Sequence, residues 1–108
     1  MSRLTLENAL RALSTVPEPY VDLFSHGSMS VELYKPVEVD HQEPHSQDEL
    51  YIVASGSGMF VNGDTRLPFE TGEVLFVAAG VEHRFEDFSE DFSTWVIFYG
   101  PEGGEIDN

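Results

Sequence analysis

Between residues 21 and 100, apolar and polar side chains alternate with a period of two, and this pattern limits the fold more than any other feature of the chain. In the stretch MSVELY (29–34) every second residue is apolar, which is typical of a strand with one buried face. About seven short strands, with turn residues about every 8 to 12 positions, predict an all-β fold, either an antiparallel sandwich or a barrel. The other strand-like stretches are ELYIVAS (49–55), MFVNGDTRLPF (59–69, two strands around an Asn-Gly-Asp turn), GEVLFVAAG (72–80), EHRFEDF (82–88) and STWVIFYG (93–100).

The first 20 residues follow a different pattern, with apolar residues at the spacing of an amphipathic helix. Thr5 or Ser2 is a suitable N-cap, because a hydroxyl at that position accepts a hydrogen bond from the first turn, and Pro17 and Pro19 end the helix. We expect a short N-terminal helix that covers one end of the core or contacts a partner subunit. Its apolar residues are Leu4, Leu6, Ala9, Leu10 and Leu13.

Length and composition narrow the range of functions. The chain has 108 residues, enough for one domain, which we divide into an N-terminal helix and linker (1–20), a barrel (21–100) and a flexible acidic tail (101–108). The absence of cysteine excludes disulfides and thiolate metal sites and favours a cytoplasmic location. Twenty acidic residues against five basic residues give a net charge of −15, which would repel nucleic acid and anionic membranes. No apolar stretch reaches the length of a membrane span.

Histidines and carboxylates gather in HQEPHSQDELYIVASGSG (41–58), where they precede an apolar run and a glycine turn. Alternate residues of an extended chain point to the same side, so His41, Glu43 and His45 share one face if this segment is extended. Pro44 favours that conformation, since proline restricts the preceding residue to the extended region. The segment is therefore a candidate metal site, although a solvated, salt-bridged loop would carry the same residue types.

Glu49 is the carboxylate of this stretch that we expect to face the barrel interior. The alternation groups Glu49 with Tyr51 and Val53, whereas the neighbouring Asp48 falls on the other face of the strand with Leu50. An ionised carboxylate inside a barrel is costly unless it is paired or bound to a metal. The interior position of Glu49 therefore predicts a cation beside it.

A third ligand has to come from elsewhere in the chain, and His26 and His83 are the remaining histidines. His83 follows an apolar strand and a glycine turn, so a hairpin at this point would fold it back toward the first pair of strands. His26, in FSHGS (24–28), is better interpreted as a turn residue. His83 is therefore the candidate third ligand.

These residues stand at the spacing of two motifs of the cupin superfamily. The first runs His-x-His, three or four residues, Glu, six residues, Gly, and the matching positions here are Glu43, His45, Glu49 and Gly56. The second runs Gly, five residues, Pro-x-Gly, two residues, His, three residues, Asn, and the matching positions are Gly72, Ala78, Gly80, His83 and Asp87. The chain resembles this superfamily over residues 29–99. Its PHSQDE segment is similar to that of small single-domain cupins with a Pro-His-x-x-Asp-Glu first motif.

Four positions depart from the motifs. Val37 stands in place of the glycine that opens the first motif. Ala78 replaces the proline and Asp87 the asparagine of the second motif, and both changes concern the shape of turns. Glu43 replaces the first histidine, and this change alters the ligand set itself.

The resemblance implies a double-stranded β-helix, or jelly-roll barrel, that holds one divalent metal per chain through His45, Glu49 and His83, with Glu43 as a fourth ligand. Two histidines and a carboxylate are typical of non-haem iron, and a second carboxylate makes iron, manganese or zinc the expected metals, with nickel as a further candidate. Glu43 could instead be a solvated carboxylate at the rim. His41 could be solvated or could orient a ligand from behind.

The resemblance leaves two classes of function open. In the first, the protein is a mononuclear metalloenzyme that acts on a small molecule as a dioxygenase, isomerase or lyase. The metal would then be a Lewis acid or oxygen activator, with Tyr51 as a proton donor. In the second, the protein is a module that binds or senses a metal or small ligand without turnover.

Strands that are apolar on both faces, EVLFVAA (73–79) and TWVIFY (94–99), also predict a homodimer that buries one of these faces.

Overall fold

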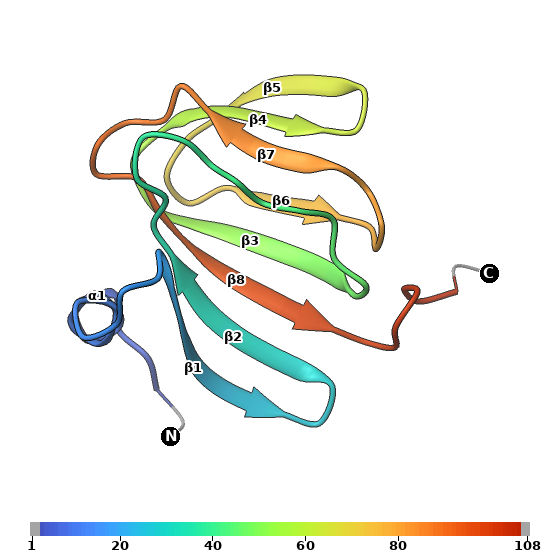
Figure 1. The fold of residues 1–108 in the computed structure, drawn as a ribbon, viewed down its shortest axis with the longest axis horizontal. Helices are drawn as coiled ribbons and strands as arrows, with labels where there is room; N and C mark the ends of the chain where they lie inside the picture. Colours follow the sequence, from blue (N-terminus) through green and yellow to red (C-terminus); the bar gives the residue numbers. More distant parts are fainter. Residues whose placement is uncertain (1–2, 107–108) are drawn as a thin grey trace.

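Two antiparallel β-sheets face each other, with one short helix beside them (Figure 1). The computed structural model describes residues 3–106. Its elements are α1 (Leu6–Leu13), β1 (Tyr20–His26), β2 (Met29–Tyr34), β3 (Asp48–Ser55), β4 (Gly58–Asn62), β5 (Thr65–Phe69), β6 (Val74–Val77), β7 (His83–Glu86) and β8 (Ser93–Tyr99). The large sheet has the strand order β1-β2-β8-β3-β6, and the small sheet has the order β5-β4-β7. This confirms the predicted all-β jelly-roll barrel with an N-terminal helix.

The strands β2 to β8 all fall within or against the stretches that the period-two pattern predicts. The Asn-Gly-Asp turn joins β4 to β5, where Asn62 pairs with Thr65 and Gly63 adopts a φ of 59°, a value that favours glycine. Strand β1 was not predicted as a strand. It is an edge strand that pairs only with β2, none of its residues is fully buried, and its sequence shows no clear apolar alternation.

Helix α1 begins at the predicted N-cap. The Thr5 side chain accepts a hydrogen bond from the Asn8 N–H at 3.1 Å, and the helix ends before Pro17. The alternative cap, Ser2, lies outside the described residues. The helix packs on β1 and β2, where Ala9 is buried. Within residues 3–106, no helix is long and apolar enough to cross a membrane.

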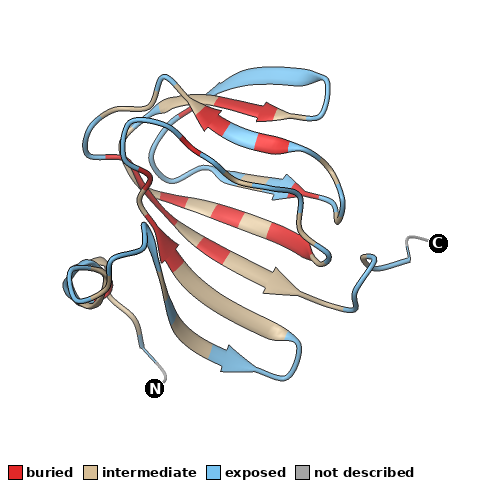
Figure 2. Cartoon of the chain, in the orientation of Figure 1, coloured by how far each residue is buried: buried red, intermediate tan, exposed pale blue. Residues whose placement is uncertain are grey.

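An aromatic core fills the space between the small sheet and the β3 side of the large sheet. The Phe85 ring of β7 lies at its centre, and four other rings have their centroids 4.7–5.3 Å away from it. These four rings belong to Tyr51, Phe60, Phe69 and Phe92. Figure 2 shows buried residues on β3, β4, β7 and β8, whereas β5 is mostly exposed. We call the cluster formed by Phe85 and these four rings the aromatic core.

The connector between β2 and β3, residues 35–47, contains no strand, and it runs beside β7 before it reaches β3 (Figure 1). The buried Asp40 carboxylate fastens it. This carboxylate accepts hydrogen bonds from the Phe85 N–H of β7 at 2.8 Å, from the Gln42 side chain at 2.7 Å and from the Tyr34 hydroxyl. Because β7 is the edge strand of the small sheet, Asp40 satisfies a backbone donor that no strand reaches.

The C-terminal segment is hydrogen-bonded to the rest of the chain as far as Glu105. The Asp48 carboxylate accepts hydrogen bonds from the backbone N–H groups of Ala79 and Glu105, at 3.0 and 2.8 Å, and these bonds hold the pKa of Asp48 below its usual value. The Gly103 N–H donates to the Ser46 carbonyl. Two attachment points therefore hold this segment against the connector and β3.

Candidate metal centre

Three of the four predicted ligands lie together at the border between the connector and the two sheets. His45 comes from the connector, Glu49 from β3 and His83 from β7, and each offers a ligand atom within 4.8 Å of the other two. The Nε2 atom of His83 lies 3.1 Å from the Oε1 atom of Glu49. Residues that are far apart in the sequence thus form one compact group of two imidazoles and one carboxylate.

The position of Glu49 follows from the strand alternation. Strand β3 lies between β8 and β6, and Glu49 is opposite Phe98 on one neighbour and Val77 on the other. Its side chain points into the barrel on the same face as Tyr51, as the sequence predicts, and is 1% exposed. The adjacent Asp48 is also buried, but it binds backbone N–H groups outside the metal group.

Backbone contacts orient both histidines. The Nδ1 of His83 lies 2.9 Å from the Val81 carbonyl, and a hydrogen bond donated there leaves Nε2 to face Glu49. The carbonyl of His45 accepts a hydrogen bond from the Gly80 N–H at 2.8 Å, which ties the connector to the turn before β7. The His45 and Phe98 rings also form a T-shaped pair, with centroids 4.8 Å apart.

Three polar atoms in this group are buried without a hydrogen-bond partner: Glu49 Oε1, Glu49 Oε2 and His83 Nε2. The Glu49 and His83 side chains approach each other, but they are not aligned as a hydrogen bond. Buried polar atoms in proteins nearly always have partners, and an unpaired carboxylate in an apolar interior is strongly disfavoured. A cation at this point would give all three atoms a partner, so the residues fit a metal ion.

The pKa values of the two imidazoles are shifted in opposite directions. Burial lowers the pKa of His45, which keeps the ring in the neutral form that binds metals. Burial opposes the charging of His83 too, but the adjacent Glu49 carboxylate and the Val81 carbonyl outweigh it and raise the pKa of His83. A metal bound at Nε2 would displace any proton held there.

Glu43, the predicted fourth ligand, lies outside this group. Its side chain is exposed, as is that of His41, and the residue between them, Gln42, points into the interior instead. The reason is local conformation: residues 41–46 are not a strand, so the alternation that we extended back from β3 does not apply to them. The hydrogen bonds of Gln42 to Asp40 fix this different orientation.

Tyr51 is also placed differently from the prediction of a proton donor. Its side chain is fully buried in the aromatic core, and its hydroxyl donates to Gln42 Oε1 at 2.7 Å, with burial raising the pKa of the phenol. Tyr51 is not among the residues that line the neighbouring cavity, whereas Tyr34 is. The Tyr51 hydroxyl is therefore held by Gln42, and the side chain has no exposed surface.

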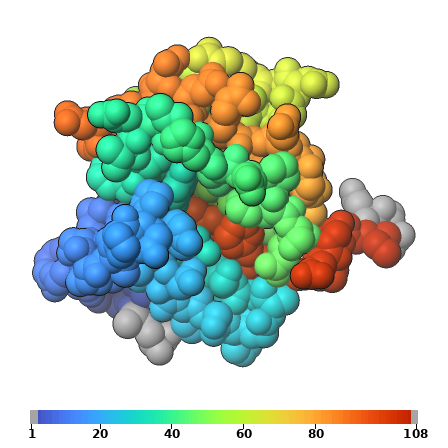
Figure 3. All heavy atoms as spheres, in the orientation of Figure 1, coloured from blue at the N-terminus to red at the C-terminus, as the bar shows by residue number. Residues whose placement is uncertain are grey.

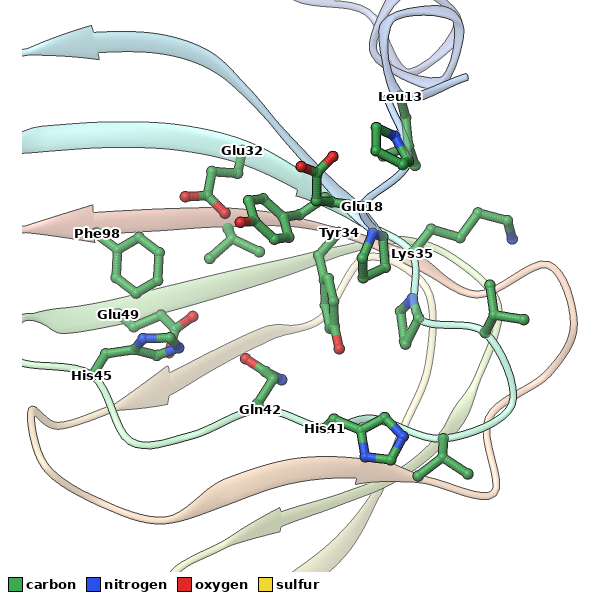
Figure 4. Close-up of a pocket in the computed structure, with 17 residues that line it drawn as sticks. Leu13, Glu18, Glu32, Tyr34, Lys35, His41, Gln42, His45, Glu49 and Phe98 are labelled. Atoms are coloured by element: carbon green, nitrogen blue, oxygen red, sulfur yellow. The ribbon is translucent and has the colours of Figure 1, made fainter. Parts of the chain in front are cut away.

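A cavity of about 800 Å³ opens beside the metal group. Figure 3 shows it as a hollow between the connector and the N-terminal part of the chain, with β8 visible at its floor. His45, Glu49 and Gln42 lie on its inner side (Figure 4). Most of its wall is apolar and consists of Leu13, Pro17, Pro19, Tyr20, Tyr34, Pro36, Val37, Val39, Val96 and Phe98. Among the described residues that line it, none belongs to β4, β5 or β7.

The sequence pattern did not identify Gln42, Asp40 or Glu32 as residues near the site. Glu32 was assigned to the polar side of MSVELY, opposite the apolar residues, yet this polar side lines the cavity together with Tyr34. A signal was present, since Tyr34 on that side is a large residue that a strand rarely leaves exposed. Asp40 and Gln42 carried no such signal, because they lie in an irregular segment.

Comparisons with known proteins agree with this architecture. A family model described as a cupin domain matches residues 30–98. An uncharacterized protein of Streptomyces coelicolor, SCO3923, is 39% identical over 85 residues, which is 77% of this chain and 81% of that protein. The crystal structure of protein NMB1881 from Neisseria meningitidis has a TM-score of 0.68 at 19% identity and covers 92% of this chain and 100% of that one. A cupin-2 domain containing protein from Shewanella frigidimarina has a TM-score of 0.66 at 18% identity, with 90% and 94% of the two chains covered. The structures support the fold alone, because their sequence identities are low.

Proposed function

The chain belongs to the family of cupin domains, and from this premise we propose that it is a mononuclear metalloenzyme that converts a small molecule. His45, Glu49 and His83 would hold one divalent metal per chain. The observation that carries the proposal is the set of buried polar atoms of Glu49 and His83 that have no hydrogen-bond partner. Glu49 and His45 also line the neighbouring cavity, which is wide enough for a small molecule.

The donor set narrows the choice of metal. Two imidazoles and one carboxylate suit iron, manganese, zinc or nickel, and two histidines with one carboxylate are best known from non-haem iron sites. Since Glu43 is exposed, we propose three protein ligands in place of four. When bound, such a metal supplies a Lewis acid or an oxygen activator, which is the chemistry of a dioxygenase, an isomerase or a lyase.

The chain's own residues would bind and orient the substrate. The apolar wall of the cavity excludes water from the bound molecule, which strengthens polar interactions at the metal group. The Gln42 side chain lies in the cavity and is held from both ends, because its Oε1 accepts from Tyr51 and its Nε2 donates to Asp40. We therefore propose that Gln42 helps to fix the position of a metal-bound substrate.

The alternative is a module that binds a metal or small ligand without converting it. One observation favours it: Tyr51, the proton donor that the sequence suggests, has no contact with the cavity. Product formation by the iron-, manganese-, zinc- or nickel-loaded protein across a panel of carbonyl, phenol, thiol and sugar substrates separates the two. Absence of turnover with every metal would favour the binding module.

The metal is tested by elemental analysis of the purified protein. We expect about one metal ion per chain, and we expect His45→Ala and His83→Ala each to reduce it to background because each removes a ligand. Glu43→Gln is the matched control, since it removes an exposed carboxylate two residues from His45 and should leave the metal content unchanged. Full metal content in both histidine variants would refute the site.

We also propose that the protein is a cytoplasmic homodimer. The lack of cysteine supports a reducing compartment. The outer face of β6 exposes Val74 and Phe76, at 61% and 49%, which a second subunit would bury. Light scattering at micromolar concentration should give twice the mass of the chain, and a monomer would contradict the dimer.

A further inference from the structure

The cavity beside the metal group has a wall of apolar side chains that three separate parts of the chain contribute. The N-terminal segment (residues 13–20) supplies Leu13, Pro17, Pro19 and Tyr20, the connector supplies Pro36, Val37 and Val39, and the large sheet supplies Tyr34, Val96 and Phe98. Three of these residues are prolines, which restrict the backbone of the two irregular stretches before any ligand binds. The volume of about 800 Å³ falls in the range of small-molecule sites.

Some of these apolar side chains are exposed to solvent at this cavity. Val37, Val39 and Tyr20 are 75%, 57% and 45% exposed, and all three line it. They come from β1 and from the connector, which are separate segments of the chain. A single exposed apolar residue is common, but a group of them around one cavity indicates a surface that another molecule covers. Burial of this surface would supply binding free energy to an apolar ligand.

Among the described residues that line the cavity, Lys35 is the one lysine or arginine, and it already has partners. Its Nζ donates to two backbone carbonyls in the loop before β8, at 2.9 and 3.3 Å. In Figure 4 its side chain extends away from His45 and Glu49. A phosphate or carboxylate on the body of a substrate would therefore meet the negative charge of the protein without a basic side chain to bind it.

The carboxyl groups of the wall offer little to a cationic substrate. Glu18 is exposed, so water screens its charge. Glu32 of β2 is half-buried, and burial together with the nearby Asp22 carboxyl raises its pKa from 4.5 to about 8. Glu32 is therefore mostly protonated at neutral pH. Away from the metal group, the inner wall presents mainly neutral surface.

Strand β8 connects the metal group to this apolar wall. In the pairing of β8 with β3, Phe98 is opposite Glu49, and in the pairing of β8 with β2, Val96 is opposite Glu32. Phe98 and Val96 are two residues apart on one strand, so their side chains share a face, and both line the cavity. A molecule that binds the metal at one end would therefore lay its body along apolar side chains.

We propose that the substrate of this site is an uncharged molecule with an apolar body and a metal-binding head group. The body lies between the N-terminal segment and the connector, along Val96 and Phe98. This inference rests on the proposed function for the head group only. Sugars, phosphates and amino acids do not fit, because their polar groups would lose water without finding partners on this wall.

Hydroxamates of different length test the proposal by isothermal titration of the metal-loaded protein, since all of them bind a metal through the same head group. We expect the affinity to rise about fourfold for each methylene that the wall buries, and by at least about tenfold from acetohydroxamate to hexanohydroxamate. Compounds of the same length as hexanohydroxamate that end in an ammonium or a carboxylate group should bind more weakly than it does. An affinity independent of length, or tighter binding of either charged compound, would overturn the proposal.

A pair of valine variants assigns the effect to the wall. Val39→Ser removes apolar surface from the cavity and should reduce the gain from acetohydroxamate to hexanohydroxamate about threefold, with no change in metal content. Val74→Ser is the matched control, because Val74 is similarly exposed but lies on β6, outside the cavity wall, and it should keep the full gain. Equal gains in the two variants would overturn the assignment to this wall.

A metal-free comparison separates failure of this inference from failure of the proposed function. Titration with 1-hexanol should change the amide chemical shifts of the residues that line the cavity, and 1-butanol should do so more weakly, whether or not the protein binds a metal. Loaded metal without this length dependence would leave the metal site intact and overturn the apolar substrate. If Val39→Ser instead converts a dimer to a monomer in light scattering and length has no effect, a second copy of the chain covers the wall, and the proposal is wrong.

Discussion

The two halves of the large sheet carry similar strands but face different partners. On the β3 side the small sheet covers the sheet with the rings of Phe60, Phe69 and Phe85, and the aromatic core fills the space. On the β1–β2 side the cover is the connector, an irregular segment without large rings, and a cavity of about 800 Å³ remains. The covering element, more than the sheet, therefore decides whether a region of this barrel becomes core or binding site.

The metal group lies where these halves meet. Glu49 and His83 are placed by β3 and β7, beside the packed core, whereas His45 is placed by the connector. This division places two ligands on strands and the third on an irregular segment, which is held by the hydrogen bonds of Asp40 and by the Gly80 N–H. Substitutions in the two halves should therefore have separable effects on stability and on binding.

The largest expected effect comes from the aromatic core. Phe85→Ala removes the central ring and should lower the free energy of unfolding by about 3–5 kcal/mol, because the surrounding rings cannot close the void. Phe98→Ala, which removes a half-buried ring from the cavity wall, should cost about 1–2 kcal/mol. Urea unfolding of the metal-free proteins measures both values. Equal losses would remove the distinction between core and cavity.

A smaller effect is expected where the connector is fastened. Asp40→Ala leaves the Tyr34 hydroxyl and the Phe85 N–H without their acceptor and should cost about 2–3 kcal/mol. Hydrogen exchange should accelerate in residues 36–47 more than in β4, and metal affinity should fall because His45 lies on the connector. The control Asp64→Ala, at an exposed turn, should change neither. Unchanged exchange in the connector of the Asp40 variant would show that other contacts hold it.

The smallest effect is a pH dependence on the cavity side. The pKa of Glu32 is about 8 in the folded protein against an ordinary value of 4.5, so between these values the folded state binds more protons than the unfolded state. The stabilisation is therefore present at pH 4 and is lost as the pH rises through 8. The thermal midpoint of the metal-free wild-type protein should fall relative to that of Glu32→Gln between pH 5 and pH 9. Parallel midpoints across this range would show that Glu32 titrates normally.

The regular parts of the molecule could be predicted from the sequence. The period-two pattern located β2 to β8, and the same alternation selected Glu49 over Asp48 for the interior. These inferences succeed because a strand fixes the direction of each side chain. His83 could also be predicted as a ligand. The turn and the strand that bring it beside Glu49 are both recognisable in the sequence.

The errors fall where no regular element fixes the side chains. The alternation was extended to Glu43, but the hydrogen bonds of Asp40 turn the connector so that Gln42 faces the interior. The sequence places Tyr51 inside the barrel, as the structure does. Whether that position belongs to the aromatic core or to the cavity depends on the rings that the small sheet contributes. Those contacts join distant segments, and a single sequence does not show them.

The most direct test of the metal centre is anomalous X-ray scattering from crystals of the protein as purified, measured above and below the absorption edges of iron, manganese, zinc and nickel. The account predicts one peak per chain, adjacent to His83 Nε2, a Glu49 carboxylate oxygen and the His45 ring, at the edge of one of these metals. The absence of a peak from this group in protein that contains metal by elemental analysis would contradict it, as would a peak at Glu43 or elsewhere.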